Sequence, residues 1–161
     1  MRYVYWIIDR LLAGRPGPGL RPWDPAALYA GGIRVVISLP AEEAIGDLTP
    51  YGLVHYRAEF PPVKLYSVGM RKAFIYQALP VWAFIHEQME ADRPTLVHCY
   101  AGQDRTGAIL AGYLITYQGK SPEQALQQVR SVKPMAMTAE GYADVLTLLE
   151  PDTIPDPKTL L

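Results

Sequence analysis

The sequence has few of the residues that build disulfides and metal centres. Among 161 residues there is one cysteine, Cys99, and the three histidines are far apart in the chain. A single cysteine excludes a disulfide within the chain and a second thiol that could resolve an oxidised one, and it fits a reducing, cytoplasmic location. Three scattered histidines provide no set of ligands for zinc. We therefore expect no metal and no other cofactor.

A dominant charge and a long hydrophobic run are also missing. Fifteen lysines and arginines oppose sixteen aspartates and glutamates, which gives a formal net charge of −1. No broad basic surface is therefore available for nucleic acid or anionic lipid. The apolar segment Val4–Ile8 ends at Asp9 and is too short for a secretory signal or a membrane span. We expect no nucleic-acid partner and no membrane span, and the sequence leaves the oligomeric state open.

The one cysteine lies in a segment that combines apolar, reactive and flexible residues. Residues 95–107 read Thr-Leu-Val-His-Cys-Tyr-Ala-Gly-Gln-Asp-Arg-Thr-Gly. The apolar run before Cys99 predicts a buried strand, and the stretch Ala108–Tyr117 predicts a helix that is apolar nearly all round. We therefore expect a strand, a glycine-bearing loop and then the N-terminus of a buried helix.

The loop after Cys99 has the chemistry of a phosphate site. A loop that closes tightly onto a helix N-terminus directs several backbone N–H groups at one point, where the helix dipole adds positive potential. Gly102 suits a position that needs a positive φ or a close backbone approach. Arg105, six positions after the cysteine, can fold back and hold two phosphate oxygens with its planar guanidinium. The same field favours a thiolate, so a nucleophile would lie beneath the bound phosphate.

The pattern His98-Cys99, five residues, then Arg105-Thr106 resembles the protein tyrosine phosphatase superfamily, whose motif is His-Cys-x5-Arg-Ser/Thr between a strand and a helix. The run Trp6–Gly14 is similar to the opening of the compact dual-specificity group of that superfamily. The resemblance implies hydrolysis of a phosphate monoester, on a phosphorylated protein or a small molecule, through a cysteinyl-phosphate intermediate. It implies an enzyme, a protein tyrosine or dual-specificity phosphatase.

The resemblance also implies a role for each residue of the motif. Cys99 attacks phosphorus, while Arg105 and the loop amides hold the oxygens that carry charge in the transition state. Thr106 donates its hydroxyl to the sulfur when the thiolate leaves, and His98 braces the loop backbone. The phosphate-binding loop is expected to comprise Tyr100, Ala101, Gly102, Gln103, Asp104 and Arg105.

The general acid that should protonate the leaving oxygen is not at its usual place. Members of the superfamily usually carry an aspartate well upstream of the cysteine, but this chain has none between Asp47 and Asp92, and Asp92 precedes the wrong end of the cysteine strand. Asp104, inside the loop, is our preferred acid, because relatives with Cys-x-x-Gly-x-Asp-Arg-Thr are thought to use that aspartate. Glu59, followed by phenylalanine as in the usual Asp-Phe pair, is the alternative. For either residue, pairing with Arg105 or exposure to water is the competing interpretation.

Two other functions compete with a protein phosphatase. The sequence Asp104-Arg105-Thr106 also occurs in phosphoinositide and inositol-phosphate phosphatases, which share the mechanism. Those enzymes often place a lysine beside the aspartate, where this chain has Gln103, and the difference favours the protein phosphatase. The other function is a phosphate-binding module without catalysis, which the undecided acid suggests and the intact Cys99 and Arg105 oppose.

Strands and helices alternate along the sequence, which is typical of an α/β protein. We predict strands within residues 3–8, 11–13, 33–39, 51–58 and 95–97 and helices over 25–30, 70–90, 108–117, 122–130 and 139–149. The resemblance implies an α/β/α sandwich of three layers around a mixed sheet of four or five strands. We expect a single phosphatase domain over residues 1–150 and a loose tail over 151–161. In the superfamily a loop glutamate often braces the active-site arginine, and Glu42 or Glu43 is the candidate, with a solvated loop charge as the equal alternative.

Overall fold

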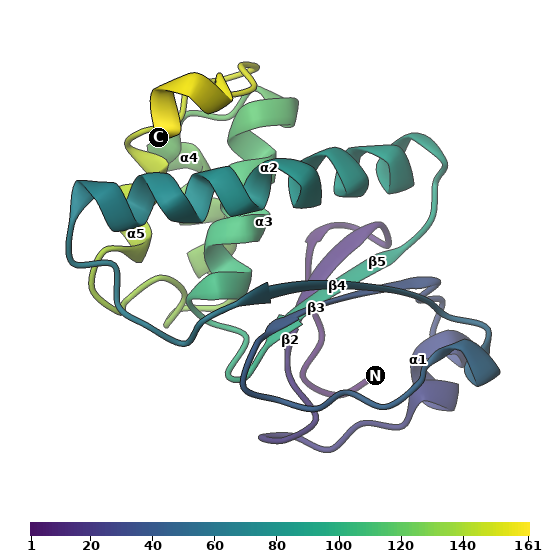
Figure 1. Ribbon diagram of the computed structural model, residues 1–161. Coiled ribbons are helices and arrows are strands. Elements are labelled where there is room, and N and C mark those ends of the chain that lie inside the picture. Colours follow the sequence, from purple (N-terminus) through teal and green to yellow (C-terminus); the bar gives the residue numbers. More distant parts are fainter.

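A five-stranded mixed sheet forms the centre of the computed structural model, which describes all 161 residues (Figure 1). Its strand order is β1-β2-β5-β3-β4, and only β1 runs antiparallel to its neighbour. The strands are β1 Tyr5–Ile8, β2 Leu12–Pro16, β3 Val35–Pro40, β4 Val54–Phe60 and β5 Thr95–Cys99. The prediction of a mixed sheet with four or five strands is confirmed. The strand that carries the cysteine, β5, is the middle one.

Helices cover the two faces of the sheet unequally (Figure 1). On one face lie α2 Val68–Glu90, α3 Arg105–Gln118, α4 Pro122–Val132 and α5 Tyr142–Leu146. The other face carries the short helix α1 Pro25–Ala30, whose N-cap Asp24 accepts a hydrogen bond from the Ala26 amide at 3.0 Å. Two 3-10 turns complete the elements, η1 Thr49–Tyr51 and η2 Pro157–Leu160. The predicted α/β/α arrangement of three layers is confirmed.

Apolar side chains fill the interfaces on both faces of the sheet. A larger cluster of 31 buried residues lies between the sheet and helices α2 to α5, and a smaller cluster of eight lies on the α1 face. Along β3, Val35 and Ile37 belong to the larger cluster and Val36 to the smaller one, as the two-residue period of a strand requires. A parallel strand that is buried on both faces reads as a continuous apolar run, which is why residues 33–39 are recognisable in the sequence.

Helix α3 is buried almost throughout, as its sequence predicts. Every residue of Arg105–Thr116 is buried. Gly112 allows this packing, because a Cβ there would lie 2.1 Å from the ring of Trp82, whose indole Nε1 donates to the Ile109 carbonyl at 2.9 Å. The first turn of α3, which carries the arginine of the motif, is therefore fixed by the core.

Two predicted elements have different bounds in the structure. The helix predicted over 139–149 is only α5 Tyr142–Leu146, because Gly141 before it has a φ of +89° and a Cβ there would lie 2.0 Å from the Leu65 carbonyl oxygen. Strand β4 begins at Val54 rather than 51, since η1 and Gly52, with a φ of +82°, occupy the first predicted residues. Both differences come from tight turns at glycines.

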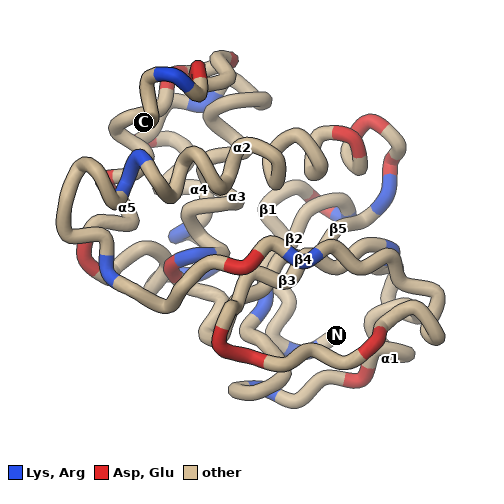
Figure 2. The backbone as a smooth tube through the Cα atoms, in the orientation of Figure 1, with Lys and Arg blue, Asp and Glu red and all other residues tan.

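The C-terminal residues 151–161, for which we predict a loose tail, run back to α2 and end in η2 (yellow in Figure 1). The Asp152 amide donates to the Ile115 carbonyl at 2.9 Å, and the half-buried Leu160 packs against the larger cluster. Basic and acidic residues are scattered among one another over the molecule (Figure 2). None of the helices combines the length and the apolar character that crossing a membrane requires.

Candidate active site

Cys99 ends β5 at the carboxyl edge of the parallel strands, and only 2% of its surface is exposed. Gly102 turns the following loop with a φ of +70°, and α3 begins at Arg105. The predicted arrangement of strand, loop and helix is therefore confirmed. No backbone N–H from Ala101 to Arg105 donates a hydrogen bond within the protein. Five consecutive amides are thus free at a helix N-terminus, which is the arrangement that binds an anion.

The outer side of this loop is held by residues that the sequence did not indicate. The Tyr5 hydroxyl donates to the Gly102 carbonyl at 2.5 Å, and the Gly17 amide donates to the Tyr100 carbonyl at 3.0 Å. Burial raises the pKa of Tyr5 well above its ordinary value, so the hydroxyl keeps its proton. Gly14 gives the tyrosine room, because a Cβ there would lie 2.3 Å from its ring. The Gln103 carbonyl also accepts, from the Met137 amide at 3.1 Å, so three loop carbonyls are engaged while the loop amides stay free.

Gly102→Ala is expected to destabilise the fold by about 3 kcal/mol, because an L side chain is strained at positive φ and its Cβ would lie 2.6 Å from the backbone of Arg15 and Pro16. Urea unfolding followed by circular dichroism measures this change. Gly46→Ala is the matched control, since nothing lies within 4 Å of a Cβ there. Equal stability of the two variants would contradict a strict requirement for glycine at the turn.

Arg105 is held by a two-pronged ion pair with Glu42. Its Nη1 donates to Glu42 Oε1 at 2.8 Å and to the Phe60 carbonyl at 3.0 Å, and its Nη2 donates to Glu42 Oε2 at 2.7 Å. The hydrogen bond from Arg105 lowers the pKa of Glu42, so the carboxylate stays charged. Glu43 instead accepts a hydrogen bond from the Gly19 amide at 2.6 Å. Of the two candidate glutamates, Glu42 contacts the arginine.

His98 is fully buried and packs against Trp23, which belongs to the α1 face of the sheet. Its Nδ1 lies 3.1 Å from the Cys99 carbonyl oxygen, which can only accept, so Nδ1 donates the proton. Burial lowers the pKa of His98 to about 4, so the ring is neutral at neutral pH. The geometry fits the expected role of bracing the backbone at the cysteine.

The buried histidine should make the stability of the protein depend on pH. Between pH 6.5 and about 4 the unfolded chain binds a proton at His98 and the folded chain does not, so the free energy of unfolding falls as the pH falls. The difference in pKa corresponds to about 3 kcal/mol. His98→Asn keeps an N–H donor but does not titrate, so urea unfolding at pH 7 and pH 4.5 should show a smaller loss in this variant. Parallel losses would contradict the prediction.

Thr106 and Asp104 flank the arginine at the start of α3. The Thr106 hydroxyl is buried and has no hydrogen-bond partner in the protein, so it is free to donate to a neighbouring acceptor. Asp104 Oδ1 accepts a hydrogen bond from the Ala139 amide at 3.1 Å. Asp104 and Arg105 together line a cavity of about 150 Å³. The structure thus brings the preferred acid candidate and the motif arginine to one cavity.

Glu59 lies elsewhere. It is an exposed residue of the edge strand β4, its side chain makes no hydrogen bond or ion pair, and it does not line the cavity. Its neighbour Phe60 contributes to the site only through its carbonyl, which accepts from Arg105. The geometry therefore favours Asp104 over Glu59 as the acid.

Lys64 and Tyr142 also line the cavity, and no local pattern in the sequence indicates either. Both line it with Asp104 and Arg105, and the Tyr142 hydroxyl donates to the Val63 carbonyl at 2.6 Å. Burial raises the pKa of Tyr142 to about 12, so this hydroxyl remains a donor. Only the tertiary structure brings these residues, from a loop and from α5, to the cysteine loop.

The sequence family described as dual specificity phosphatase, catalytic domain, matches residues 69–152, which is more than half of the chain. The matched part includes the cysteine strand, the loop and α3. The chain belongs to this family, and its fold and its Cys-x5-Arg site place it in the compact dual-specificity group of the protein tyrosine phosphatase superfamily.

Curated relatives match parts of the chain. The RNA/RNP complex-1-interacting phosphatase of Bos taurus is 31% identical over 110 residues, which cover 62% of this chain and 33% of the relative. The phosphatidylglycerophosphate phosphatase PTPMT1 of Arabidopsis thaliana is 38% identical over 56 residues, which cover 35% of this chain and 17% of that protein. The chain therefore spans a third or less of the length of these relatives.

The fold is found among solved structures. The active form of Tk-PTP superimposes with a TM-score of 0.75 at 23% identity, and the match covers 92% of this chain and 97% of that one. At this identity the likeness defines the fold alone, which is the one that the motif predicts.

Proposed function

We propose that this chain hydrolyses phosphate monoesters through a cysteinyl-phosphate intermediate, and that its substrates are proteins phosphorylated on tyrosine, serine or threonine. The observation that supports this most is the row of five free loop amides between Cys99 and an arginine clamped by Glu42. Amides and guanidinium offer hydrogen-bond donors to the oxygens of a phosphoryl group, and the cysteine lies at the base of the same loop. Membership of the dual specificity family supports a phosphorylated protein as substrate.

In the first step the Cys99 thiolate attacks phosphorus in line with the leaving oxygen. The S–P bond forms as the P–O ester bond breaks, and Asp104 gives its proton to the leaving oxygen. Arg105 and the loop amides hold the three equatorial oxygens while charge moves onto them. The products are a phosphorylated cysteine and the free alcohol or phenol.

In the second step a water molecule attacks the phosphocysteine. Asp104, now ionised, accepts a proton from the water as the new P–O bond forms and the S–P bond breaks. The buried Thr106 hydroxyl, which has no other partner, donates to the departing sulfur and stabilises the thiolate. Inorganic phosphate leaves and the enzyme returns to its starting state.

Phosphate release from an aryl phosphate and from phosphopeptides tests the proposal. An acid quench in the first turnover should trap phosphate on the peptide that contains Cys99, detectable by mass spectrometry. Turnover without a phosphorylated cysteine would refute the intermediate. Phosphate binding without any turnover would show a binding module and overturn the proposal.

Asp104→Asn is expected to lower kcat on a phosphotyrosine peptide by about 10²-fold, because the leaving oxygen loses its proton donor. The loss should be much smaller on an aryl phosphate whose leaving group is already stable as an anion. Glu59→Gln, the matched control, should keep kcat on both substrates because Glu59 does not reach the cavity. Steady-state kinetics of the two variants decide the assignment, and full activity of Asp104→Asn on the peptide would reject it.

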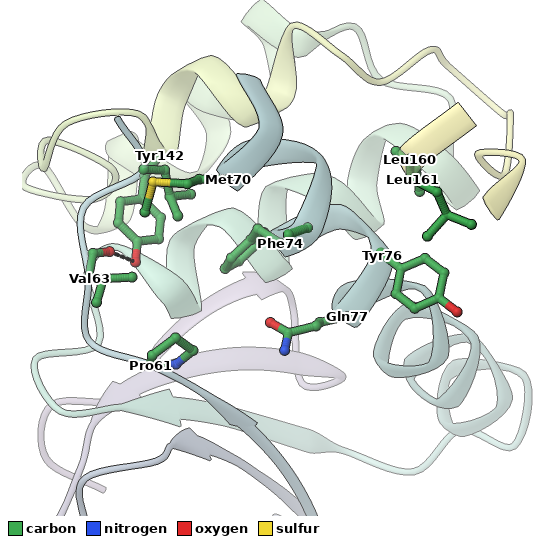
Figure 3. A pocket seen from close by; sticks show the side chains of 11 residues that line it. Pro61, Val63, Met70, Phe74, Tyr76, Gln77, Tyr142, Leu160 and Leu161 are labelled. Carbon is green, nitrogen blue, oxygen red and sulfur yellow. Dashed lines mark hydrogen bonds between the residues drawn. The ribbon is translucent and has the colours of Figure 1, made fainter. Parts of the chain in front are cut away.

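An apolar groove beside the site supports a second candidate substrate, a lipid phosphate monoester. The groove has a volume of about 430 Å³, and nine of its eleven lining residues are hydrophobic. It is lined by Pro61, Val63, Leu65, Met70, Ala73, Phe74, Tyr76, Gln77, Tyr142, Leu160 and Leu161 (Figure 3). Val63 and Tyr142 also line the cavity that contains Asp104 and Arg105, so the groove adjoins that cavity.

The lining of the groove suits an alkyl chain better than a peptide. The Tyr142 hydroxyl is already bonded to the Val63 carbonyl, as Figure 3 shows, which leaves the side chains of Gln77 and Tyr76 as polar partners. A peptide backbone loses free energy when its polar groups are buried without partners, whereas an alkyl chain has no such groups. One curated relative is named as a phosphatidylglycerophosphate phosphatase, which also supports this candidate.

A series of alkyl phosphates of increasing length separates the two substrate classes. If the groove takes an alkyl chain, kcat/KM should rise about fourfold for each buried methylene until the groove is full. Ala73→Trp, at an exposed position in the groove, should abolish this gain and leave aryl phosphate hydrolysis unchanged. Ala83→Trp, at an exposed position of the same helix outside the groove, is the control. A flat dependence on chain length would leave phosphoproteins as the substrate.

A further inference from the structure

Three polar side chains form a hydrogen-bonded line across neighbouring strands and end at the backbone of the cysteine. His55 of β4, Ser38 of β3 and His98 of β5 lie on one face, because β5, β3 and β4 are adjacent and Ser38 pairs with His98 in register. His55 Nε2 is 2.7 Å from Ser38 Oγ, and Ser38 Oγ is 2.6 Å from His98 Nε2. His98 Nδ1 then reaches the Cys99 carbonyl at 3.1 Å. The line connects a half-buried histidine to the backbone of the nucleophile.

The direction of every hydrogen bond in this line is determined from its cysteine end. The Cys99 carbonyl can only accept, so His98 Nδ1 carries a proton. The neutral His98 ring then has a lone pair at Nε2, and the Ser38 hydroxyl must donate to it. The remaining contact of Ser38 Oγ is His55 Nε2, which therefore carries a proton and donates. One arrangement of protons satisfies all three contacts.

We propose that Ser38 and His55 are positioning residues that hold His98 in the tautomer needed to anchor the Cys99 carbonyl. That carbonyl belongs to the last residue of β5, where the strand becomes the phosphate loop. If His98 changed tautomer, the lone pair of Nδ1 would face the lone pairs of the carbonyl oxygen and the anchor would be lost. Trp23 packs edge-on against the ring at 4.8 Å between centroids and restricts its tilt, but it does not select the tautomer.

Ser38 is the decisive member of the line. Both Ser38 and His98 are buried, with exposed fractions of 3% and 0%, so water cannot easily replace the serine hydroxyl. His55 is only half-buried, and water can replace part of its contribution. We therefore expect a large effect from removing the serine hydroxyl and a smaller effect from removing the His55 ring.

Nitrogen-15 NMR of the imidazole rings is the direct test, because the chain contains only three histidines. In the wild type His98 should show a protonated Nδ1 and an unprotonated Nε2. Ser38→Ala should give a mixture of tautomers and lower kcat on an aryl phosphate about tenfold with little change in KM. Ser38→Thr, which keeps the hydroxyl, should preserve both the tautomer and kcat.

Two further variants complete the test. His55→Leu should lower kcat about threefold, and His55→Gln should restore it, because the Gln amide can donate where Nε2–H does. Ser131→Ala, at an exposed serine of α4, is the control for removing a hydroxyl. A wild-type tautomer and full kcat in Ser38→Ala would overturn the proposal.

The inference rests on the proposed function only for its kinetic readout. If the wild type released no phosphate, the proposed function would fail while the NMR result would still decide the positioning role.

Discussion

Cys99→Ser is expected to lower phosphate release on the order of 10⁴-fold while phosphate affinity stays within about threefold of the wild type. A serine hydroxyl stays protonated at neutral pH and is a far weaker nucleophile than a thiolate. The five loop amides and the clamped Arg105 are not altered by this change, so the anion should still bind. Binding and chemistry should therefore separate in one variant.

Single-turnover hydrolysis of an aryl phosphate measures the chemical step, and titration calorimetry with inorganic phosphate or vanadate measures the affinity. Because Cys99 is the one cysteine of the chain, no other thiol can take over its role. Turnover within tenfold of the wild type would show that the reaction does not pass through this sulfur. Loss of phosphate binding would instead show that the substitution had damaged the loop.

Arg105→Lys is expected to lower kcat/KM about 10³-fold. The guanidinium donates to both oxygens of Glu42 and to the Phe60 carbonyl through its two Nη atoms, which leaves its Nε–H and one N–H of Nη2 free. A lysine ammonium carries its three donors on one nitrogen, so it cannot reproduce the two-pronged contact with Glu42 and also hold two phosphoryl oxygens in a planar fork. Steady-state kinetics should show a lower kcat and a higher KM.

Two further variants test whether the clamp geometry of the guanidinium, and not its charge alone, is required. Arg93→Lys, at an exposed position near the opposite end of β5, should leave kinetics unchanged. Glu42→Gln keeps the guanidinium but weakens its clamp, so the loss should be smaller than that of Arg105→Lys. If lysine at 105 supported wild-type kinetics, a point charge would suffice and the planar clamp would have no catalytic value.

The sequence indicates the proposed nucleophile and its loop because their residues are contiguous. Cys99, Gly102 and Arg105 lie within seven positions of one another, and the flanking apolar runs predict the strand and the helix directly. The apolar run at 33–39 and the predicted helix over 122–130 are likewise local signals that the structure reproduces. Local pattern therefore sufficed for the centre of the site.

The supports of the site come from distant parts of the chain and left no local pattern. Tyr5 and Gly102 are 97 positions apart, and Glu42 and Arg105 are 63 apart. The sequence could offer Glu42 and Glu43 only as a pair, because neighbouring residues differ by which tertiary contact their side chains reach. The same limit applies to the last helix, which Gly141 shortens through a close approach to the backbone of Leu65.

The free amides of the loop also have a consequence for turnover. In the proposed reaction the amides from Ala101 to Arg105 donate to phosphoryl oxygens that the ester and the released inorganic phosphate have in common. The loop amides alone do not distinguish product from substrate. A preference for the ester over inorganic phosphate must therefore come from residues that contact the alcohol part of the ester. Competitive product inhibition should follow, and sulfate or phosphate in a buffer should both slow the reaction and raise the melting temperature.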